Sequence, residues 1–144
     1  MRVSVIHDES LSAAERSALR AAALAPLLRR CGDQLGIPKS HGVALRLGDD
    51  AALRELNHRF REVDDATDVL AFPGDRPHVG DIAISVPRGL RQADDGIAEL
   101  RLLAVHGLLH CLGHDHAGTA EAELMTAETR RLLPDQDIPA LVSH

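Results

Sequence analysis

His106-Gly107-Leu108-Leu109-His110-Cys111-Leu112-Gly113-His114-Asp115-His116 is the stretch that decides the fold around a candidate site. It contains the spacing H-x-x-x-H-x-x-G-x-x-H. His106 and His110 are four residues apart, so on a helix they lie one above the other on the same face. Gly113 is suited to the left-handed conformation that ends a helix, which lets the chain turn back and bring in His116. The stretch therefore predicts a metal site at the end of a helix.

The chemistry of that site follows from its three ligands. Three neutral imidazoles hold a zinc-type ion at about 2.0–2.1 Å and leave a fourth position open to water or substrate, which is typical of a catalytic site. The alternative is a histidine-rich helix end without a metal. With 9 His and 11 Gly in 144 residues, the spacing arises by chance at a frequency of roughly 0.003. We therefore expect one zinc ion, or another divalent transition metal in its place, on His106, His110 and His116.

The residue after the first histidine bears on the reaction. Zinc peptidases with this spacing carry a glutamate there as general base, whereas this chain has Gly107. A metzincin-like peptidase would need its base from elsewhere, for example from His114 or Asp115. The peptidase alternative is thereby weakened but stays open.

Length and composition favour one globular domain over residues 1–144, with 44% hydrophobic residues and a net charge of −6. The acidic balance argues against a general nucleic-acid binder. RNA could bind only if arginines gathered on one face. Phe60 and Phe72 are the two aromatic residues, which argues against stacked aromatic platforms for single-stranded RNA. The arginines considered for such a face are Arg54, Arg59, Arg61, Arg76 and Arg88.

The sequence also indicates a cellular location. Cys31 and Cys111 form no disulfide or zinc framework, and Cys111 is expected to pack as a small apolar residue. The first residues lack the pattern of a signal peptide, and no apolar run is long enough to span a bilayer. We expect a cytoplasmic protein with no membrane contact.

Hydrophobic periodicity predicts an α+β fold, a small mixed four-stranded sheet packed with about five helices. The helix at 97–112 is apolar on nearly all sides and should be buried, with the metal site at its end. Ser12 and Glu15 predict a capping box, Pro26 a bend and Thr119 a helix cap. The expected strands are 2–6, 42–47, 67–72 and 79–86, and the expected helices are 12–30, about 49–59, 88–93, 97–112 and 119–133.

With these elements in place, the chain resembles the YbeY family of metal-dependent endoribonucleases, the rRNA maturation factors. Residues 106–116 match the family pattern H-G-x-L-H-x-x-G-[YF]-D-H, with His114 in the aromatic place. Residues 56–61 (LNHRFR) resemble L-N-x-x-[YF]-R, 67–73 (TDVLAFP) resemble T-[DN]-V-L-S-F-P, and 80–85 (GDIAIS) resemble G-D-I-x-I-S. Met125 falls where the family tends to carry methionine. The resemblance runs from about residue 42 to 133.

The resemblance implies a compact α+β fold, a zinc-type ion on the three histidines, and hydrolysis of phosphodiesters in single-stranded RNA. It further implies a role in small-subunit rRNA maturation and ribosome quality control, with ribosomal RNA and the small subunit as partners. Arg61 corresponds to an arginine that the family needs for activity. A planar guanidinium suits two-pronged hydrogen bonding to phosphate oxygens, while the ion acts as Lewis acid or supplies hydroxide.

Other polar residues carry weaker expectations. His114 is expected at the rim of the site, and Asp115 either caps the turn before His116 or acts as a base or ligand partner. Asp68 and Asp81 either orient the imidazoles or bond to nearby backbone. A non-enzymatic alternative is a ribosome-assembly factor whose metal only holds the helix end. The oligomeric state is not determined by the sequence.

Overall fold

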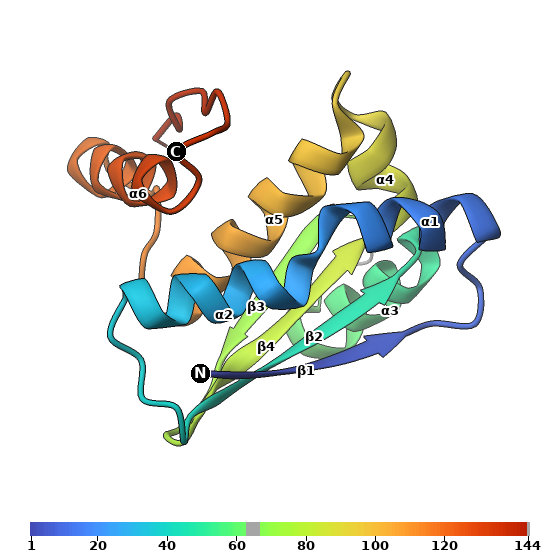
Figure 1. Ribbon diagram of the computed structural model, residues 1–144, viewed down its shortest axis with the longest axis horizontal. Helices are drawn as coiled ribbons and strands as arrows, with labels where there is room; N and C mark the ends of the chain where they lie inside the picture. Colours follow the sequence, from blue (N-terminus) through green and yellow to red (C-terminus); the bar gives the residue numbers. More distant parts are fainter. Residues whose placement is uncertain (63–66, 144) are drawn as a thin grey trace.

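A mixed sheet of four strands forms the centre of the computed structural model, which describes residues 1–62 and 67–143. The strands β1 (Arg2–His7), β2 (Gly42–Gly48) and β4 (His78–Ser85) run parallel to one another. The strand β3 (Val69–Pro73) pairs with β4 in the antiparallel direction. The order β1-β2-β4-β3 places β3 at an edge (Figure 1). The predicted α+β class and mixed four-stranded sheet are confirmed.

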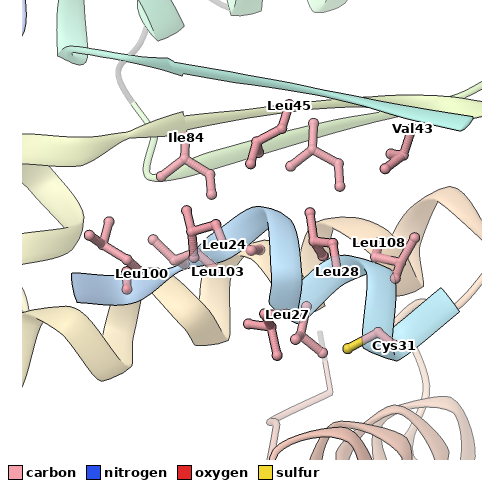
Figure 2. Close-up of a cluster of buried hydrophobic side chains, with 14 of the residues drawn as sticks. Leu24, Leu27, Leu28, Cys31, Val43, Leu45, Ile84, Leu100, Leu103 and Leu108 are labelled. Carbon is pink, nitrogen blue, oxygen red and sulfur yellow. The ribbon is translucent and has the colours of Figure 1, made fainter. Parts of the chain in front are cut away.

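One face of the sheet carries the main core. The helices α1 (Ala13–Ala22), α2 (Leu24–Gln34) and α5 (Gly96–Cys111) cover this face, and α3 (Asp50–Arg61) lies on the other (Figure 1). Alternate residues of β2 and β4 point toward the three helices, as expected for strands with two unlike faces. Figure 2 shows the resulting layer of packed side chains, among them Leu24, Leu27, Leu28, Val43, Leu45, Ile84, Leu100, Leu103 and Leu108.

The helix α5 is the buried helix that the sequence predicts. Leu100, Ala104, Val105, Leu108 and Leu109 have no exposed surface. Its exposed apolar residues lie at the two ends, where Ile97 and Leu112 are 37% and 41% exposed. Because α5 packs against β3 and β4, its C-terminal end is fixed close to the sheet edge.

The predicted helix over 12–30 is two helices. The break falls at Ala23, which has a left-handed backbone (φ 50°), and not at Pro26 as expected. Pro26 lies in the first turn of α2, where a backbone N–H has no partner within the helix and proline is tolerated. The capping box of α1 is confirmed: the Glu15 amide donates to Ser12 Oγ at 3.1 Å, and the Ser12 amide donates to Glu15 Oε1 at 2.8 Å.

The remaining boundaries shift by a few residues. Asp49 caps α3 by accepting from the Ala52 amide at 2.9 Å. The strand β3 begins at Val69 and not at residue 67. The short helix α4 (Val86–Arg91) begins directly after β4, with Pro87 in its first turn. The described residues thus hold six helices, one more than expected, because the first predicted helix is divided.

Thr119 is not the cap of the last helix, α6 (Thr119–Leu132). The carbonyl of Gly118 accepts from the Ala122 amide at 2.9 Å, so the helix begins one residue earlier than predicted and Gly118 is the cap. Figure 1 shows α6 and the C-terminal segment packed beyond the end of α2 and α5. Within the described residues, no helix combines the length and the apolar character needed to cross a bilayer.

Candidate functional site

The C-terminal end of α5 turns as the spacing predicts. Gly113 has φ 96°, its amide donates to the His110 carbonyl at 3.0 Å, and the His114 amide donates to the Leu109 carbonyl at 3.0 Å. These two hydrogen bonds form a Schellman motif, which commonly ends helices at a glycine. The turn reverses the chain after His110 and brings His116 back beside it, with the two ring centroids 5.7 Å apart.

A polar cavity of about 520 Å³ opens at this turn, between the end of α5 and the edge strand β3. It brings together the predicted residues Arg61, His110 and His116. The wall that β3 forms was not predicted from the sequence, although alternate residues of an edge strand necessarily face one side. Its lining is Arg61, Asp68, Val69, Ala71, Pro73, His110, Gly113, His114, Asp115 and His116.

His106 lies one turn before His110, in the more buried part of α5. Its pKa is lowered to about 4, chiefly by burial and to a smaller extent by the nearby His110 and His116. Burial also lowers the pKa of His110, with smaller contributions in the same direction from His116 and Arg61. Both imidazoles are therefore neutral at pH 7, which is the form that binds a metal.

The three histidines fit a zinc-type ion by their chemistry. The Nε2 atom of His106 is buried and has no hydrogen-bond partner among the described residues, an arrangement that costs free energy unless something binds the nitrogen. A metal ion at that atom would remove this cost. Among the described residues, no three His, Cys, Asp or Glu side chains already stand in coordinating geometry. The ligand set His106, His110 and His116 accordingly stays a prediction.

Arg61 is the last residue of α3 and reaches the cavity from the other side of β3. Glu62, directly after Arg61, is the C-cap of the helix and has a left-handed conformation (φ 57°). The guanidinium Cζ lies 5.8 Å from the centroid of the Phe72 ring, a cation–π contact. Its charge also acts on His110. The guanidinium is thus held at the cavity, where an anionic group could meet it.

The carboxylates near the cavity have local partners. Asp115 Oδ1 accepts from the His116 amide at 2.7 Å, which agrees with its role as a cap of the turn. Asp68 Oδ1 accepts from the Val69 amide at 2.8 Å, and its Oδ2 accepts from Gln92 at 3.0 Å. The charge of Asp68 acts to raise the pKa of His106, so the carboxylate interacts with the imidazole through space as well as with its own backbone.

Asp81 takes no part in this cavity. Its Oδ2 lies 3.0 Å from His78 Nε2, and the residue lines a separate hollow with Phe72 and Ala83. The possibility that Asp81 orients the imidazoles therefore receives no support.

Two further residues pack as expected. Cys111 is buried, and burial raises the pKa of its thiol to about 12, so it stays protonated and is unsuited to binding the ion. Its Sγ lies 3.9 Å from the Phe72 carbonyl oxygen. Met125 of α6 is fully buried in the main core.

Gly107 has a structural reason to lack a side chain. A Cβ atom at this position would lie 2.6 Å from Cγ2 of Ile82 in β4, far inside carbon–carbon contact distance. The helix α5 packs too closely on the sheet at this point for a glutamate. The position that carries the general base in zinc peptidases is therefore closed here, which argues against the peptidase alternative.

Of the five arginines considered for an RNA face, Arg54, Arg59 and Arg61 belong to α3 and Arg88 belongs to α4. Arg61 lines the cavity, and Arg59 lies next to it in sequence, with its Cζ 5.3 Å from the Phe60 ring centroid. Arg88 binds the Asp50 carboxylate at 2.9 Å, and Arg76 lines a different hollow. Among the described residues that line the cavity, the positive charge comes from Arg61 at the end of α3.

Taken together, the site is a histidine-lined polar cavity at the edge of a mixed α+β sheet, with one guanidinium opposite the imidazoles. Residues 7–136 match the sequence profile of the family described as Endoribonuclease YbeY. A relative of that name from Moorella thermoacetica is 43% identical over 116 residues, covering 68% of this chain and 74% of the relative. One from Pseudomonas putida is 42% identical over 108 residues, covering 67% and 69%.

The chain belongs to the Endoribonuclease YbeY family, and the resemblance found in the sequence is confirmed. The fold agrees with a solved structure, the solution structure of TM1509 from Thermotoga maritima. That protein is 23% identical, with a TM-score of 0.50 over 92% of this chain and 90% of the other. At that identity the likeness concerns the fold alone.

Proposed function

We propose that this endoribonuclease cleaves single-stranded RNA with the help of one zinc-type ion held by His106, His110 and His116. The observation that carries the proposal is the buried Nε2 atom of His106, which finds no hydrogen-bond partner in the part of the chain that the structure describes. It lies on the same helix as His110, whose cavity also contains Arg61 and His116. A chain of the same family with a neutral, unsatisfied imidazole at this place is well suited to bind a metal.

The ion would polarise a phosphate oxygen or lower the pKa of a bound water. The residues of the chain would do the rest. The guanidinium of Arg61 would donate two hydrogen bonds to the non-bridging oxygens of the scissile phosphate and stabilise the charge that grows there during cleavage. His114, at the rim of the cavity, would contact the entering RNA without binding the ion.

The biological setting is part of the same proposal. We expect ribosomal RNA of the small subunit as the substrate, with roles in its maturation and in ribosome quality control. A cytoplasmic location agrees with two free, buried cysteines. The ribosomal small subunit is the expected partner.

Replacement of Arg61 by lysine tests the guanidinium. Arg61→Lys should keep the bound metal and lose about 100-fold in kcat, because an ammonium group keeps the charge but not the planar pair of donors. Arg20→Lys, on the exposed surface of α1, is the matched control and should cleave at the parental rate.

The assay compares single-stranded precursor rRNA segments with the same segments in duplex, each with and without chelator. The proposal expects metal-dependent cleavage of the single-stranded form. Parental cleavage by Arg61→Lys would exclude the phosphate contact, and cleavage that survives complete metal removal would exclude the ion.

A further inference from the structure

The two aromatic residues of this chain lie against each other. Phe60 of α3 and Phe72 of β3 have ring centroids 5.6 Å apart and planes tilted by 59°. Each ring also has a guanidinium nearby: Arg59 Cζ is 5.3 Å from the Phe60 centroid, and Arg61 Cζ is 5.8 Å from the Phe72 centroid. The composition, with no Trp or Tyr and two Phe in 144 residues, argued against an aromatic platform, but both rings are gathered in one place.

Phe60 is a large apolar residue that does not lie in the core. The buried residues of α3 are Leu53 and Asn57, whereas Phe60 is 61% exposed. Its ring lines a hollow of about 450 Å³ between α3 and the sheet, together with Leu56 and Phe72. A large apolar ring that borders an open apolar hollow is a feature of binding surfaces.

The aromatic pair is continuous with the candidate site. Along the edge strand β3, Ala71 and Pro73 line the histidine cavity, while Phe72 between them lines the hollow on the other face of the sheet. Arg61 belongs to both places, because it lines the cavity and also lies over the Phe72 ring. A strand of nucleic acid that has one phosphate at Arg61 can therefore cross the edge of β3 and reach the rings with a neighbouring base.

We propose that Phe60 and Phe72 form a stacking platform for a nucleobase next to the cleaved phosphate. Flat apolar rings, each with a guanidinium group over it, match the chemistry of a single-stranded RNA, which offers a π face beside a negative charge. In a duplex, stacking between neighbouring base pairs covers this face, so the platform also gives a physical reason for a preference for single strands. This inference rests on the proposed RNA cleavage and adds the subsite that positions the substrate.

Replacement of Phe60 provides the test because the side chain is exposed and its loss leaves the core intact. Phe60→Ala should raise KM for single-stranded RNA about tenfold, which corresponds to the loss of one base stack, and leave kcat nearly unchanged. Phe60→Trp should restore the parental KM, whereas Phe60→Leu should not, since leucine is apolar but has no π face. Leu124→Ala, an equally exposed apolar residue on α6, should have no effect.

Abasic substitution of the RNA separates stacking from a general loss of binding. Each position near the cleaved bond is replaced in turn by an abasic nucleotide. For the parental enzyme, one position should raise KM about tenfold. For Phe60→Ala the same replacement should have little further effect, because the base has already lost its partner. Equal and additive losses in the two enzymes would overturn the proposal, as would a parental KM in both Phe60→Ala and Phe60→Leu.

A binding measurement keeps this inference distinct from the proposed function. A short RNA carries 2-aminopurine at the sensitive position, or at each position in turn when cleavage identifies none. Its fluorescence should fall on binding the parental holoenzyme and should not fall on binding Phe60→Ala. Quenching without any cleavage would support the platform and refute the proposed activity. Cleavage without Phe60-dependent quenching would refute the platform alone. Light scattering provides one more test. If the parent is a dimer and Phe60→Ala is a monomer, the hollow binds a second copy of the chain, and the proposed platform is overturned.

Discussion

Gly107 provides a sharp test of how closely α5 packs on the sheet beneath the candidate site. In Gly107→Ala the new methyl group would lie 2.6 Å from Cγ2 and 3.2 Å from Cγ1 of Ile82. Ile82 is 1% exposed, so its side chain is packed among neighbours that oppose its rotation. The contact can be relieved only by moving the helix or the strand.

The expected change in the free energy of unfolding for Gly107→Ala follows from two opposing effects. Alanine is the better helix former by about 1 kcal/mol, whereas overpacking of a filled core costs about 1–3 kcal/mol and more when backbone must move. Because the new methyl group overlaps with two atoms of a buried side chain, we expect the cost of overpacking to exceed the gain in helix propensity. Gly107→Ala should lower the free energy of unfolding by about 1–2 kcal/mol.

Urea unfolding of four proteins measures this effect: the parent, Gly107→Ala, Ile82→Ala and the double variant. Ile82→Ala alone should cost about 2–5 kcal/mol, since it leaves a cavity. In the double variant the added methyl occupies part of that cavity. Its loss should therefore be smaller than the sum of the two single losses by about 1–2 kcal/mol. A more stable Gly107→Ala, or strictly additive losses, would refute the close approach of α5 to β4.

Two other predictions concern single side chains. Asp50 accepts hydrogen bonds from Ser85 at 2.7 Å and from Arg88 at 2.9 Å. The hydrogen bond from Arg88 is the main reason that the pKa of the Asp50 carboxyl lies well below the ordinary 3.8. Asp50→Asn should therefore lower the free energy of unfolding by about 1–2 kcal/mol at pH 7. Because the pKa of Asp50 is lower in the folded chain than in the unfolded chain, the stability difference between the parent and Asp50→Asn should shrink below about pH 4, where the unfolded chain takes up the proton first. Urea unfolding at pH 7 and pH 3 measures this difference, and a constant difference would contradict the prediction. Gly113→Ala should cost about 1 kcal/mol through its left-handed φ of 96° alone, and a neutral effect in thermal unfolding would exclude the αL requirement.

The sequence predicted the end of α5 well because its determinants are local. The histidine spacing and Gly113 specify which residues share a helix face and where the helix stops, and neither depends on distant packing. The same holds for the capping box of Ser12 and Glu15. The break at Ala23 was not predicted, since a left-handed alanine follows from the packing of α1 and α2 on the sheet and not from a local signal.

Features that join distant segments were harder to predict. The contact of Phe60 with Phe72 depends on how α3 packs against the edge strand, and each residue alone looks like an ordinary core position. The role of Gly107 was recognised only as a missing base, because its close approach to Ile82 requires the register of α5 on β4. Asp81 was considered for the site because its strand was predicted correctly, but the face to which it points was not known.

The metal content of the purified chain tests the central claim most directly. We expect about one zinc-type ion per chain after loading and dialysis, and almost none in His110→Ala, whose fold is checked by circular dichroism. No retained ion in the parental chain under any loading condition, or an equal content in a folded His110→Ala, would contradict the site on His106, His110 and His116.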